Sequence, residues 1–365
     1  MPNKLRIAID LTSLSYHITG IERFALCVTE HLINIDRQNE YILIFKDEVY
    51  KNFKDKVDDS RIKAIVLNGK NKLWFLQVTL CKCLKKVDAD KYLFFAFTSP
   101  YFFKHKGIIN TVHDMGAWDV ADSMKKSQNI YWKITINRSV KCSEKIITVS
   151  QFTKNRLSAI LHIPSKKIHV INSAVTDDFL DRPGADFQII KKKYNLPDKY
   201  IVSLSTLEPR KNFKLLLDAY TQIQEKLDYE LVLIGRKGWK IENLLSKYKD
   251  SSRVHFTGFV NDSEVKTLYS NALCFVFPTI YEGFGLPPVE ALACGTPVIS
   301  SNAASMPEVL MDRAIYFKNN DIADLQDKLI KLCDNVNSYP HSLNDFQKKN
   351  YNFSSSAYKV LELLA

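Results

Sequence analysis

The chain has 365 residues, of which 46% are hydrophobic and 25% are charged. This composition excludes a disordered chain, and the length exceeds that of most single α/β cores, so we expect two domains. The formal net charge is +11, and residues 1–180 carry most of it, with 28 Lys and Arg against 18 Asp and Glu. This basic half either favours an anionic partner, such as nucleic acid, a membrane surface or a phosphate-bearing acceptor, or only confers solubility.

Three features of the sequence bear on its location. The longest uncharged apolar run, Tyr92–Phe103, is well short of the ~20 residues that a spanning helix needs. The first residues, MPNKLRIAIDL, read as a strand and not as a signal peptide. Seven cysteines, an odd number scattered along the chain, are typical of a reducing compartment. We therefore expect a cytoplasmic protein, peripheral on the inner face of the membrane if its basic half docks there.

Strand-length apolar runs alternate with helix-length amphipathic segments, which predicts parallel sheets covered by helices. The first strand, Leu5–Leu11, precedes a loop that ends at Gly20 and a helix over Ile21–Ile33. The polar, turn-rich segment 177–188 is predicted to be a linker between two doubly wound units. Ligands are expected at the carboxyl ends of their strands. The other predicted strands are Tyr41–Phe45, Ala64–Leu67, Tyr92–Phe97, Ile108–His113, Lys145–Ser150, Ile168–Ile171, Tyr200–Ser205, Glu230–Ile234, Val254–Thr257, Leu273–Phe277 and Pro297–Ser300.

The stretch Phe275–Ser301, FVFPTIYEGFGLPPVEALACGTPVISS, is the most informative in the chain. A buried strand is followed by the loop EGFG and then by Pro287 and Pro288, which suit the first turn of a helix. The two glycines let a ligand approach the backbone closely, and free amides at the helix start can bind hydroxyl or phosphate oxygens. Gly295 then ends the helix.

Two acids in this stretch, Glu282 and Glu290, are eight residues apart, so that both carboxylates can face one site. They could hold the hydroxyls of a sugar and a ribose through charge-assisted hydrogen bonds. Two carboxylates would also suit a glycosidase, and Glu290 could simply be an acid favoured by the helix dipole. The glycine loop and the helix start favour a phosphorylated ligand instead.

This stretch resembles the signature of retaining glycosyltransferases of family 4, whose α/β GT-B fold has two Rossmann-like doubly wound domains facing a cleft. Other landmarks follow in the expected order: TGIERF, FTSPYFF, TVHDM, VSQFTKNRL, STLEPRKN, LIGRKGW and FTGFV. The resemblance implies an acceptor-side domain over 1–177 and a nucleotide-sugar-binding domain over 178–345. It also implies a C-terminal helix within 346–365 that packs back on the first domain.

The resemblance assigns roles to the residues of the glutamate loop. Glu290 would bind the donor ribose, and Glu282 would hold the donor sugar together with the loop backbone. The amide of Leu286 would lie near the diphosphate. In this loop and the start of the helix after it, the donor-binding residues implied are Glu282, Gly283, Phe284, Gly285, Leu286 and Glu290; the others in the chain are Gly20, Ser205, Arg210, Lys211 and Gly258.

In STLEPRKN, Lys211 corresponds to the diphosphate-binding lysine of the family, which would offset charge on the leaving group. Arg210 is a plausible helper, although an Arg next to a Lys is often only a solvated neighbour. Ser205 stands where many members have an arginine, six residues before the lysine. The chain thus resembles the subgroup with a small residue there, and the donor phosphates need another partner.

In the first domain, Gly20 follows the first strand and precedes a helix, so its backbone can approach the diphosphate and the acceptor. His113 ends a strand, where a histidine is often a satisfied polar group; the resemblance implies a catalytic role near the reacting carbon of the donor sugar. Arg23, Ser150 and Gly258 are weaker candidates, and Gly258 would pass close to the nucleotide base.

The sequence offers no metal site. Asp10, Asp114 and Asp119 do not form a DxD-like pair, and the spacing of cysteine and histidine does not suit zinc. We therefore expect a metal-independent enzyme without a cofactor, in which positive groups stabilise the leaving diphosphate.

The function implied is retaining transfer of a hexose, with GDP-mannose as the first choice of donor, to a hydroxyl of a lipid-linked oligosaccharide in bacterial surface polysaccharide synthesis. Rhamnosyl or glucosyl transfer from a dTDP- or UDP-sugar is the alternative, and a nucleotide-sugar epimerase of the same fold is another. Nucleic acid is not an expected partner, because no recognised binding motif is present. Lys70–Lys86 is the predicted contact with an anionic membrane, or else an ordinary helix packed on the first sheet.

Overall fold

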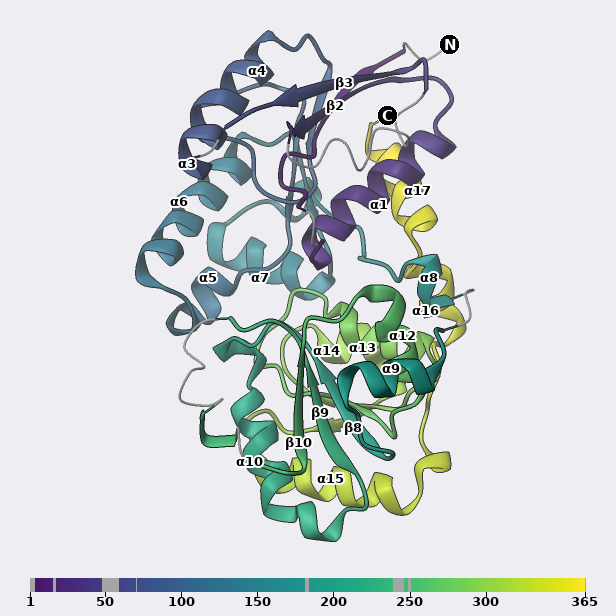
Figure 1. The fold of residues 1–365 in the computed structure, drawn as a ribbon. Helices are drawn as coiled ribbons and strands as arrows, with labels where there is room; N and C mark the ends of the chain where they lie inside the picture. The colour runs from purple at the N-terminus through teal and green to yellow at the C-terminus, as the bar shows by residue number, and fades with distance from the viewer. Residues whose placement is uncertain are drawn as a thin grey trace. The chain divides into compact units, whose positions relative to one another are not determined.

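The computed structural model describes residues 4–15, 18–47, 59–69, 71–180, 184–238, 246–248 and 251–364. Lys70, residues 181–183 of the predicted linker and Trp239 of LIGRKGW lie outside this part of the chain. The chain divides into a first unit, Met1–Ala174 with Lys349–Ala365, and a second unit, Val175–Lys348. These divisions lie close to the predicted boundaries at 177 and 345 (Figure 1).

The first unit contains a sheet of seven parallel strands in the order β3-β2-β1-β4-β5-β6-β7. β1 pairs with β2 on one side and β4 on the other, so the order of the strands along the chain reverses between β1 and β4. All five residues of β5 are buried, as expected where helices cover both faces of a parallel sheet. The strands are β1 (Arg6–Asp10), β2 (Glu40–Lys46), β3 (Ile62–Leu67), β4 (Lys91–Phe94), β5 (Ile108–Val112), β6 (Lys145–Thr148) and β7 (Ile168–Val170).

The C-terminal helix belongs to this first unit. It packs against α1, and the two lie side by side as the yellow and purple helices of Figure 1. The Ser356 hydroxyl donates to the carbonyl oxygen of Asn172 at 2.8 Å and so fixes this helix to the segment after β7. Helices of the first unit are α1 (Gly20–Ile35), α3 (Lys72–Trp74), the π-helix η2 (Phe75–Leu80), α4 (Cys81–Lys86), α5 (Gly116–Asp119), η3 (Ala121–Ser123), α6 (Lys126–Cys142), α7 (Gln151–Leu161), η4 (Ser165–Lys167) and α17 (Phe353–Leu364).

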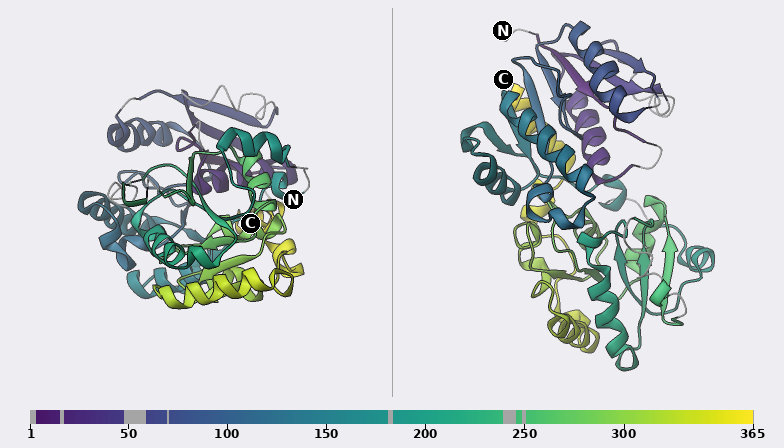
Figure 2. Two further views of the ribbon diagram at one scale, coloured as in Figure 1. Left: turned by 60° about the horizontal axis from the view of Figure 1, so that its bottom comes forward. Right: turned by 90° about the vertical axis from the view of Figure 1, so that its left-hand side faces the viewer.

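The second unit contains a sheet of six parallel strands in the order β10-β9-β8-β11-β12-β13. Here the order along the chain reverses between β8 and β11. Two helices that share a core cluster, α10 and α15, lie side by side (Figures 1 and 2). The strands are β8 (Tyr200–Leu204), β9 (Glu230–Ile234), β10 (Val254–Gly258), β11 (Phe275–Phe277), β12 (Val298–Ser301) and β13 (Ala314–Phe317).

The helices of the second unit connect these strands. Asp186 and Asp321 cap the starts of α9 and α15, because each side chain accepts a hydrogen bond from a backbone amide of the first turn. The helices are α8 (Asp177–Leu180), α9 (Phe187–Tyr194), η5 (Pro209–Lys211), α10 (Phe213–Ile223), η6 (Gln224–Lys226), α12 (Asp262–Ser270), α13 (Leu286–Ala293), α14 (Met306–Leu310), η7 (Met311–Arg313), α15 (Ile322–Asp334) and η8 (Val336–Ser338); α16 (Asp345–Asn350) crosses the boundary between the units.

The prediction of two doubly wound parallel sheets is confirmed, with local differences. β4 ends at Phe94 and not at Phe97, because the chain turns away after the strand. The predicted linker contains the one-turn helix α8, whose Phe179 is buried beside Tyr269. The short strand β13 was not predicted. An apolar run in the sequence indicates which residues are buried, but it does not indicate the residue at which the strand's hydrogen bonds to its neighbours end.

The predicted membrane segment forms a continuous helical stretch made of α3, η2 and α4. Leu80, Cys81 and Leu84 pack into a core cluster with residues of the first sheet, while Leu73 and Trp74 are more than half exposed. The stretch is therefore a helix packed on the sheet that also presents apolar side chains at its start. Among the described residues, no helix has the length and hydropathy needed to cross a bilayer. All seven cysteines are free.

Candidate active site

The most prominent group of predicted site residues lies where the strand order of the second sheet reverses. Lys211 follows β8 and Glu282 follows β11, and these two strands are neighbours in the sheet. Connections from two such strands run to opposite sides, which leaves a crevice at their carboxyl ends where α/β proteins bind ligands. The fold thus places both residues at the expected position for a ligand site.

Lys211 and Glu282 form a nearly buried ion pair. The Lys211 ammonium contacts Glu282 Oε1, and the two side chains are only 11% and 10% exposed. Arg210 Nη1 lies 3.5 Å from Glu282 Oε2, so one carboxylate faces two cations. The sequence predicted these three residues as donor-binding, but it did not predict that they contact one another.

Burial and charge shift the pKa of both partners in this pair. Burial would raise the pKa of the Glu282 carboxyl, but the charges of Lys211 and Arg210 outweigh it and hold that pKa below its usual range. Burial lowers the pKa of the Lys211 ammonium, and the Glu282 carboxylate opposes this shift. Glu282 is therefore ionised at neutral pH, and its carboxylate favours the charged form of the Lys211 ammonium.

Backbone contacts join the Arg210 turn to the glutamate loop. The amide of Ile280 donates to the carbonyl oxygen of Arg210 at 2.9 Å. The Arg210 guanidinium also contacts Glu208, a buried acid. Arg210 therefore has a structural role that would hold its side chain in place, whether or not it touches the donor.

Two buried hydroxyl groups support Glu282, and sequence reasoning missed both. Thr279 Oγ1 lies 3.1 Å from Glu282 Oε1 and 3.1 Å from the carbonyl oxygen of Arg210, and it can donate its proton to either. Ser305 Oγ donates to the carbonyl oxygen of Glu282 at 3.0 Å. Thr279 lies three residues before Glu282 in the chain, whereas Ser305 comes from the start of α14, so no local pattern could have indicated it.

Gly285 adopts a backbone conformation that favours glycine. Its φ is +82°, and a Cβ atom there would lie 2.4 Å from Met306 Cε. We expect Gly285→Ala to lower the free energy of unfolding by about 1–2 kcal/mol for the left-handed conformation, plus the cost of moving Met306. Urea unfolding of Gly285→Ala in the wild type and in a Met306→Ala background, each compared with its own parent, separates the two parts. If Gly285→Ala costs as much in the Met306→Ala background as in the wild type, the contact with Met306 is not a cause.

The rest of the glutamate loop leads into α13, which begins at Leu286 directly after Gly285. Pro287 and Pro288 occupy the first turn as predicted, and Gly295 follows the helix with a φ of +80°. Phe284 is buried, and Glu290 is 4% exposed. A buried carboxylate in the second turn of this helix fits a group held for a specific partner better than a solvated acid favoured by the helix dipole.

Ser205, Gly235 and Gly258 form a row at the carboxyl edge of the same sheet. Each follows or ends a strand, namely β8, β9 and β10. The amide of Gly235 donates to the carbonyl oxygen of Gly258 at 2.9 Å, and a Cβ atom on Gly235 would lie 1.8 Å from the carbonyl oxygen of Ser205. Sequence reasoning named Ser205 and Gly258 but missed Gly235, which the close approach requires to be glycine.

Gly258 itself leaves open space, since a Cβ atom built on it would meet nothing within 4 Å. Its φ of +73° explains the glycine on conformational grounds. The open space leaves room for a planar group, such as the base that the resemblance assigns to this position.

His113 lies directly after β5 in the first unit. Its Nε2 is 2.7 Å from the carbonyl oxygen of Phe95, and its ring packs edge-on against Phe24. Because a carbonyl oxygen only accepts, Nε2 carries the proton and Nδ1 is left as an acceptor. Burial lowers the pKa of His113, so the neutral form is favoured. Such an imidazole can accept a hydrogen bond from a sugar hydroxyl.

The lowered pKa of His113 has a consequence for stability. A folded pKa below the ordinary value of about 6.5 means that the unfolded chain binds the proton more readily. The free energy of unfolding should therefore fall as the pH drops below about 6.5 and stay level above it. We expect His113→Asn to reduce this dependence in urea unfolding at pH 5.5 and 7.5. An unchanged dependence in the variant would assign it to other groups.

Three other candidates of the first unit lie at the starts of helices. Gly20 is the first residue of α1, after the N-cap Thr19, and Glu22 Oε2 accepts a hydrogen bond from the Thr19 amide at 2.7 Å. Arg23 lies in the same first turn. Ser150 is fully buried and caps α7 by accepting from the Thr153 amide at 3.1 Å, so its position is explained by the helix start.

The sequence offers Asp10 only as a possible metal ligand, but its position in the fold indicates another role. It ends β1, where the strand order of the first sheet reverses, and it is 9% exposed. Its Oδ1 accepts from the amide and the hydroxyl of Thr12 at 3.0 and 2.7 Å. Burial raises the pKa of this carboxyl. A fixed carboxylate at this edge can bind a sugar hydroxyl. The burial of Asp10 follows from the fold and could not be predicted from the sequence.

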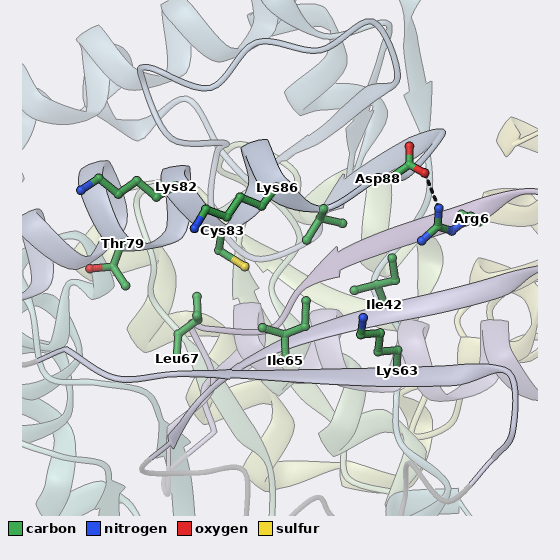
Figure 3. A pocket seen from close by; sticks show the side chains of 11 residues that line it. Arg6, Ile42, Lys63, Ile65, Leu67, Thr79, Lys82, Cys83, Lys86 and Asp88 are labelled. Carbon is green, nitrogen blue, oxygen red and sulfur yellow. Dashed lines mark hydrogen bonds and ion pairs between the residues drawn. The ribbon is translucent and has the colours of Figure 1, made fainter.

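Two pockets of the first unit are lined by other residues than these. One, of about 430 Å³, lies between the β2–β3 edge and α4 and has Arg6, Lys63, Lys82 and Lys86 around an apolar floor (Figure 3). The Arg6 guanidinium pairs there with Asp88. The other pocket lies between α3 and α6. No group of three or more potential metal ligands occurs in the described part of the chain.

Comparison with known families agrees with this fold. The profile of Glycosyltransferase Family 4 matches residues 20–179, and that of Glycosyl transferases group 1 matches residues 186–353. The O-antigen chain mannosyltransferase RfbU of Salmonella typhimurium is 30% identical over 260 residues, which cover 70% of this chain and 68% of that protein. The O-antigen chain mannosyltransferase B of Escherichia coli is 27% identical over 336 residues, or 87% and 88% of the two chains.

Solved structures show the same fold at low identity. Sucrose-phosphate synthase from Thermosynechococcus elongatus gives a TM-score of 0.76 at 16% identity, covering 99% of this chain and 98% of that one. Anabaena HepE in complex with UDP and glucose gives 0.74 at 14% identity, covering 99% of both chains. Two Rossmann-like units of this kind define the GT-B class. The chain belongs to glycosyltransferase family 4, and it is a glycosyltransferase.

Proposed function

We propose that this glycosyltransferase transfers mannose from GDP-mannose, with retention of anomeric configuration, to a hydroxyl of a lipid-linked oligosaccharide in surface polysaccharide synthesis. The observation that carries the proposal is the nearly buried Lys211–Glu282 pair at the point of strand reversal. A cation in a dry site can stabilise a leaving diphosphate, and a fixed carboxylate beside it can bind sugar hydroxyls.

Lys211 can contact Glu282 and the donor diphosphate at the same time. Its ammonium has three N–H donors, and Glu282 occupies one of them. The others can reach phosphate oxygens as the bond between the sugar carbon and the diphosphate breaks. Arg210 adds a second positive charge on the far side of the carboxylate. These two cations take the place that a metal ion has in other transferases, so the proposed reaction is metal-independent.

In the proposed reaction the acceptor oxygen attacks the anomeric carbon from the face that the diphosphate leaves. The new carbon–oxygen bond forms as the old one breaks, and the acceptor proton passes to the departing phosphate oxygen. No side chain needs to act as the base. His113, with Nδ1 as an acceptor, would bind a hydroxyl of the donor sugar, and Glu290 would bind the ribose.

The choice of donor and acceptor follows the relatives, two of which are O-antigen chain mannosyltransferases. The test is transfer of radiolabel from GDP-mannose into the lipid-extractable fraction of bacterial membranes that supply the acceptor. Incorporation from GDP-mannose, but not from UDP-glucose or dTDP-rhamnose, supports the proposal. Incorporation from one of the other donors would replace the sugar, and a changed sugar nucleotide formed without membranes would favour an epimerase.

A further inference from the structure

The pocket between α3 and α6 has the character of a site for hydrocarbon. Its volume is about 270 Å³, and most of the surface that lines it is apolar. Phe97 stacks on Trp132 at its wall, with the ring centroids 5.5 Å apart. Gln77, a polar residue of the wall, accepts a hydrogen bond from the Tyr101 amide at 2.8 Å and so is already used within the protein. A pocket with apolar walls and satisfied polar groups favours an apolar occupant.

Exposed apolar side chains are concentrated on the elements that form this pocket. Of the twelve large hydrophobic side chains that are exposed in the described residues, six belong to α3, to the segment after β4 and to α6. Exposed apolar side chains that gather on neighbouring elements in this way are typical of interaction sites. These six residues, called the apolar rim, are Leu73, Trp74, Tyr101, Phe102, Ile130 and Ile134.

One cation lies at the apolar rim, and others belong to a helix that forms the pocket. The Arg138 guanidinium lies over the ring of Tyr101, 5.6 Å from its centroid. The helix α6, which supplies one wall of the pocket, contains Lys126, Lys133, Arg138 and Lys141 and no Asp or Glu. An apolar pocket among cations is complementary to a molecule with a hydrocarbon chain and an anionic head.

The pocket also lies on the edge of the sheet where the acceptor would react. Phe97 to Pro100 follow β4, one of the two strands between which the order reverses, and Phe95 of the same segment accepts the hydrogen bond from His113. His113 and the pocket are thus linked through the segment after β4, within one unit.

We propose that this pocket binds the hydrocarbon chain of the lipid phosphate to which the acceptor saccharide is attached, with Arg138 and the lysines of α6 neutralising its phosphates. The occupant is the acceptor's own lipid and not the bilayer surface. This inference rests on the proposed function for the saccharide part, but binding of the lipid can be measured without any sugar transfer.

The test uses farnesyl diphosphate as the probe and tryptophan fluorescence as the signal, because Trp132 lies in the wall. We expect saturable quenching by farnesyl diphosphate, with at least tenfold weaker binding of farnesol and of inorganic diphosphate, since each lacks one half of the complementarity. Trp132→Phe should remove most of the signal. If inorganic diphosphate binds as tightly as farnesyl diphosphate, the probe occupies the donor site and the inference is wrong. If farnesol binds as tightly as farnesyl diphosphate, the lysines do not neutralise the phosphates as proposed.

Two variants test the location. Leu73→Asp puts a charge on the exposed lip, and Gln128→Glu is an isosteric change that repels an anion; both side chains line the pocket and are exposed. We expect each to weaken farnesyl diphosphate binding about tenfold or more. Tyr358→Asp, at a similarly exposed position on α17, should have no effect.

Other outcomes would overturn the assignment. If Lys63→Gln loses farnesyl diphosphate binding and Leu73→Asp keeps it, the probe binds in the pocket of Figure 3 instead. Binding to phosphatidylglycerol vesicles but not to farnesyl diphosphate would indicate a membrane surface instead. GDP binding by the same variants serves as the control for the proposed function: it should be unchanged, and its absence from the wild type would refute the donor site and leave the lipid result standing.

Discussion

Lys211→Ala is expected to lower the rate of sugar transfer by about 100- to 1000-fold, the usual loss when one preorganised charge-stabilising donor is removed. It should also destabilise the fold. Its removal leaves the Glu282 carboxylate, 10% exposed, with Arg210 at 3.5 Å as its remaining ion-pair partner in the described residues. Breaking a buried pair in this way costs about 3–5 kcal/mol. Urea unfolding measures the loss of stability, and initial rates measured well below the melting temperature give the loss of sugar transfer.

The chain offers a matched control for this variant in Lys214, one turn further along. Its side chain is 73% exposed and pairs with Asp218 on the surface. Lys214→Ala should change stability by less than about 1 kcal/mol and leave transfer unaffected. Transfer at the wild-type rate by folded Lys211→Ala would contradict the assignment of the site. If Lys211→Ala loses activity but not stability, the ion pair is not the stabilising contact described here.

Gly235→Ala is expected to be the most destabilising glycine substitution at the carboxyl edge of the second sheet. The φ of +147° costs a non-glycine residue about 1–3 kcal/mol, and the Cβ atom would lie 1.8 Å from a backbone oxygen that must then move. That oxygen belongs to Ser205, so donor binding should weaken together with stability.

Gly258→Ala separates the cost of the positive φ from the cost of the clash with the new Cβ atom. Its φ of +73° carries a similar conformational cost, but the new methyl group meets open space. Urea unfolding should show the smaller loss for Gly258→Ala, of about 1–2 kcal/mol. GDP titration should show a loss of affinity for both variants, because Gly235→Ala displaces Ser205 and the new methyl group of Gly258→Ala occupies the space assigned to the base. Equal stability of the two variants would mean that β8 and β9 can separate at little cost.

The sequence predicted the sheets and the glutamate loop because their signals are local. Apolar runs and glycine or proline at fixed positions determined the strands, the loop and the start of α13. The contact between Lys211 and Glu282 could not be predicted in this way, since 71 residues separate them and only the pairing of β8 with β11 brings them together.

Burial was the other property that the sequence did not reveal. Asp10 was weighed only as a metal ligand, because its spacing from other acids was the sole available measure. Ser150 was a weak site candidate until the fold showed it as a buried helix cap. Which side chains of 71–87 face the sheet and which face solvent likewise depends on how the helix packs, and the apolar rim became visible only then.

The central claim, that the second unit holds a nucleotide diphosphate at Lys211 and Glu282, is tested most directly by thermal unfolding with GDP, UDP, dTDP and ADP. A ligand that binds only the folded protein raises its melting temperature. We predict a selective rise with GDP in the wild type that is absent from Lys211→Ala. A rise with another nucleotide would change the donor, and no rise with any of the four would contradict the claim.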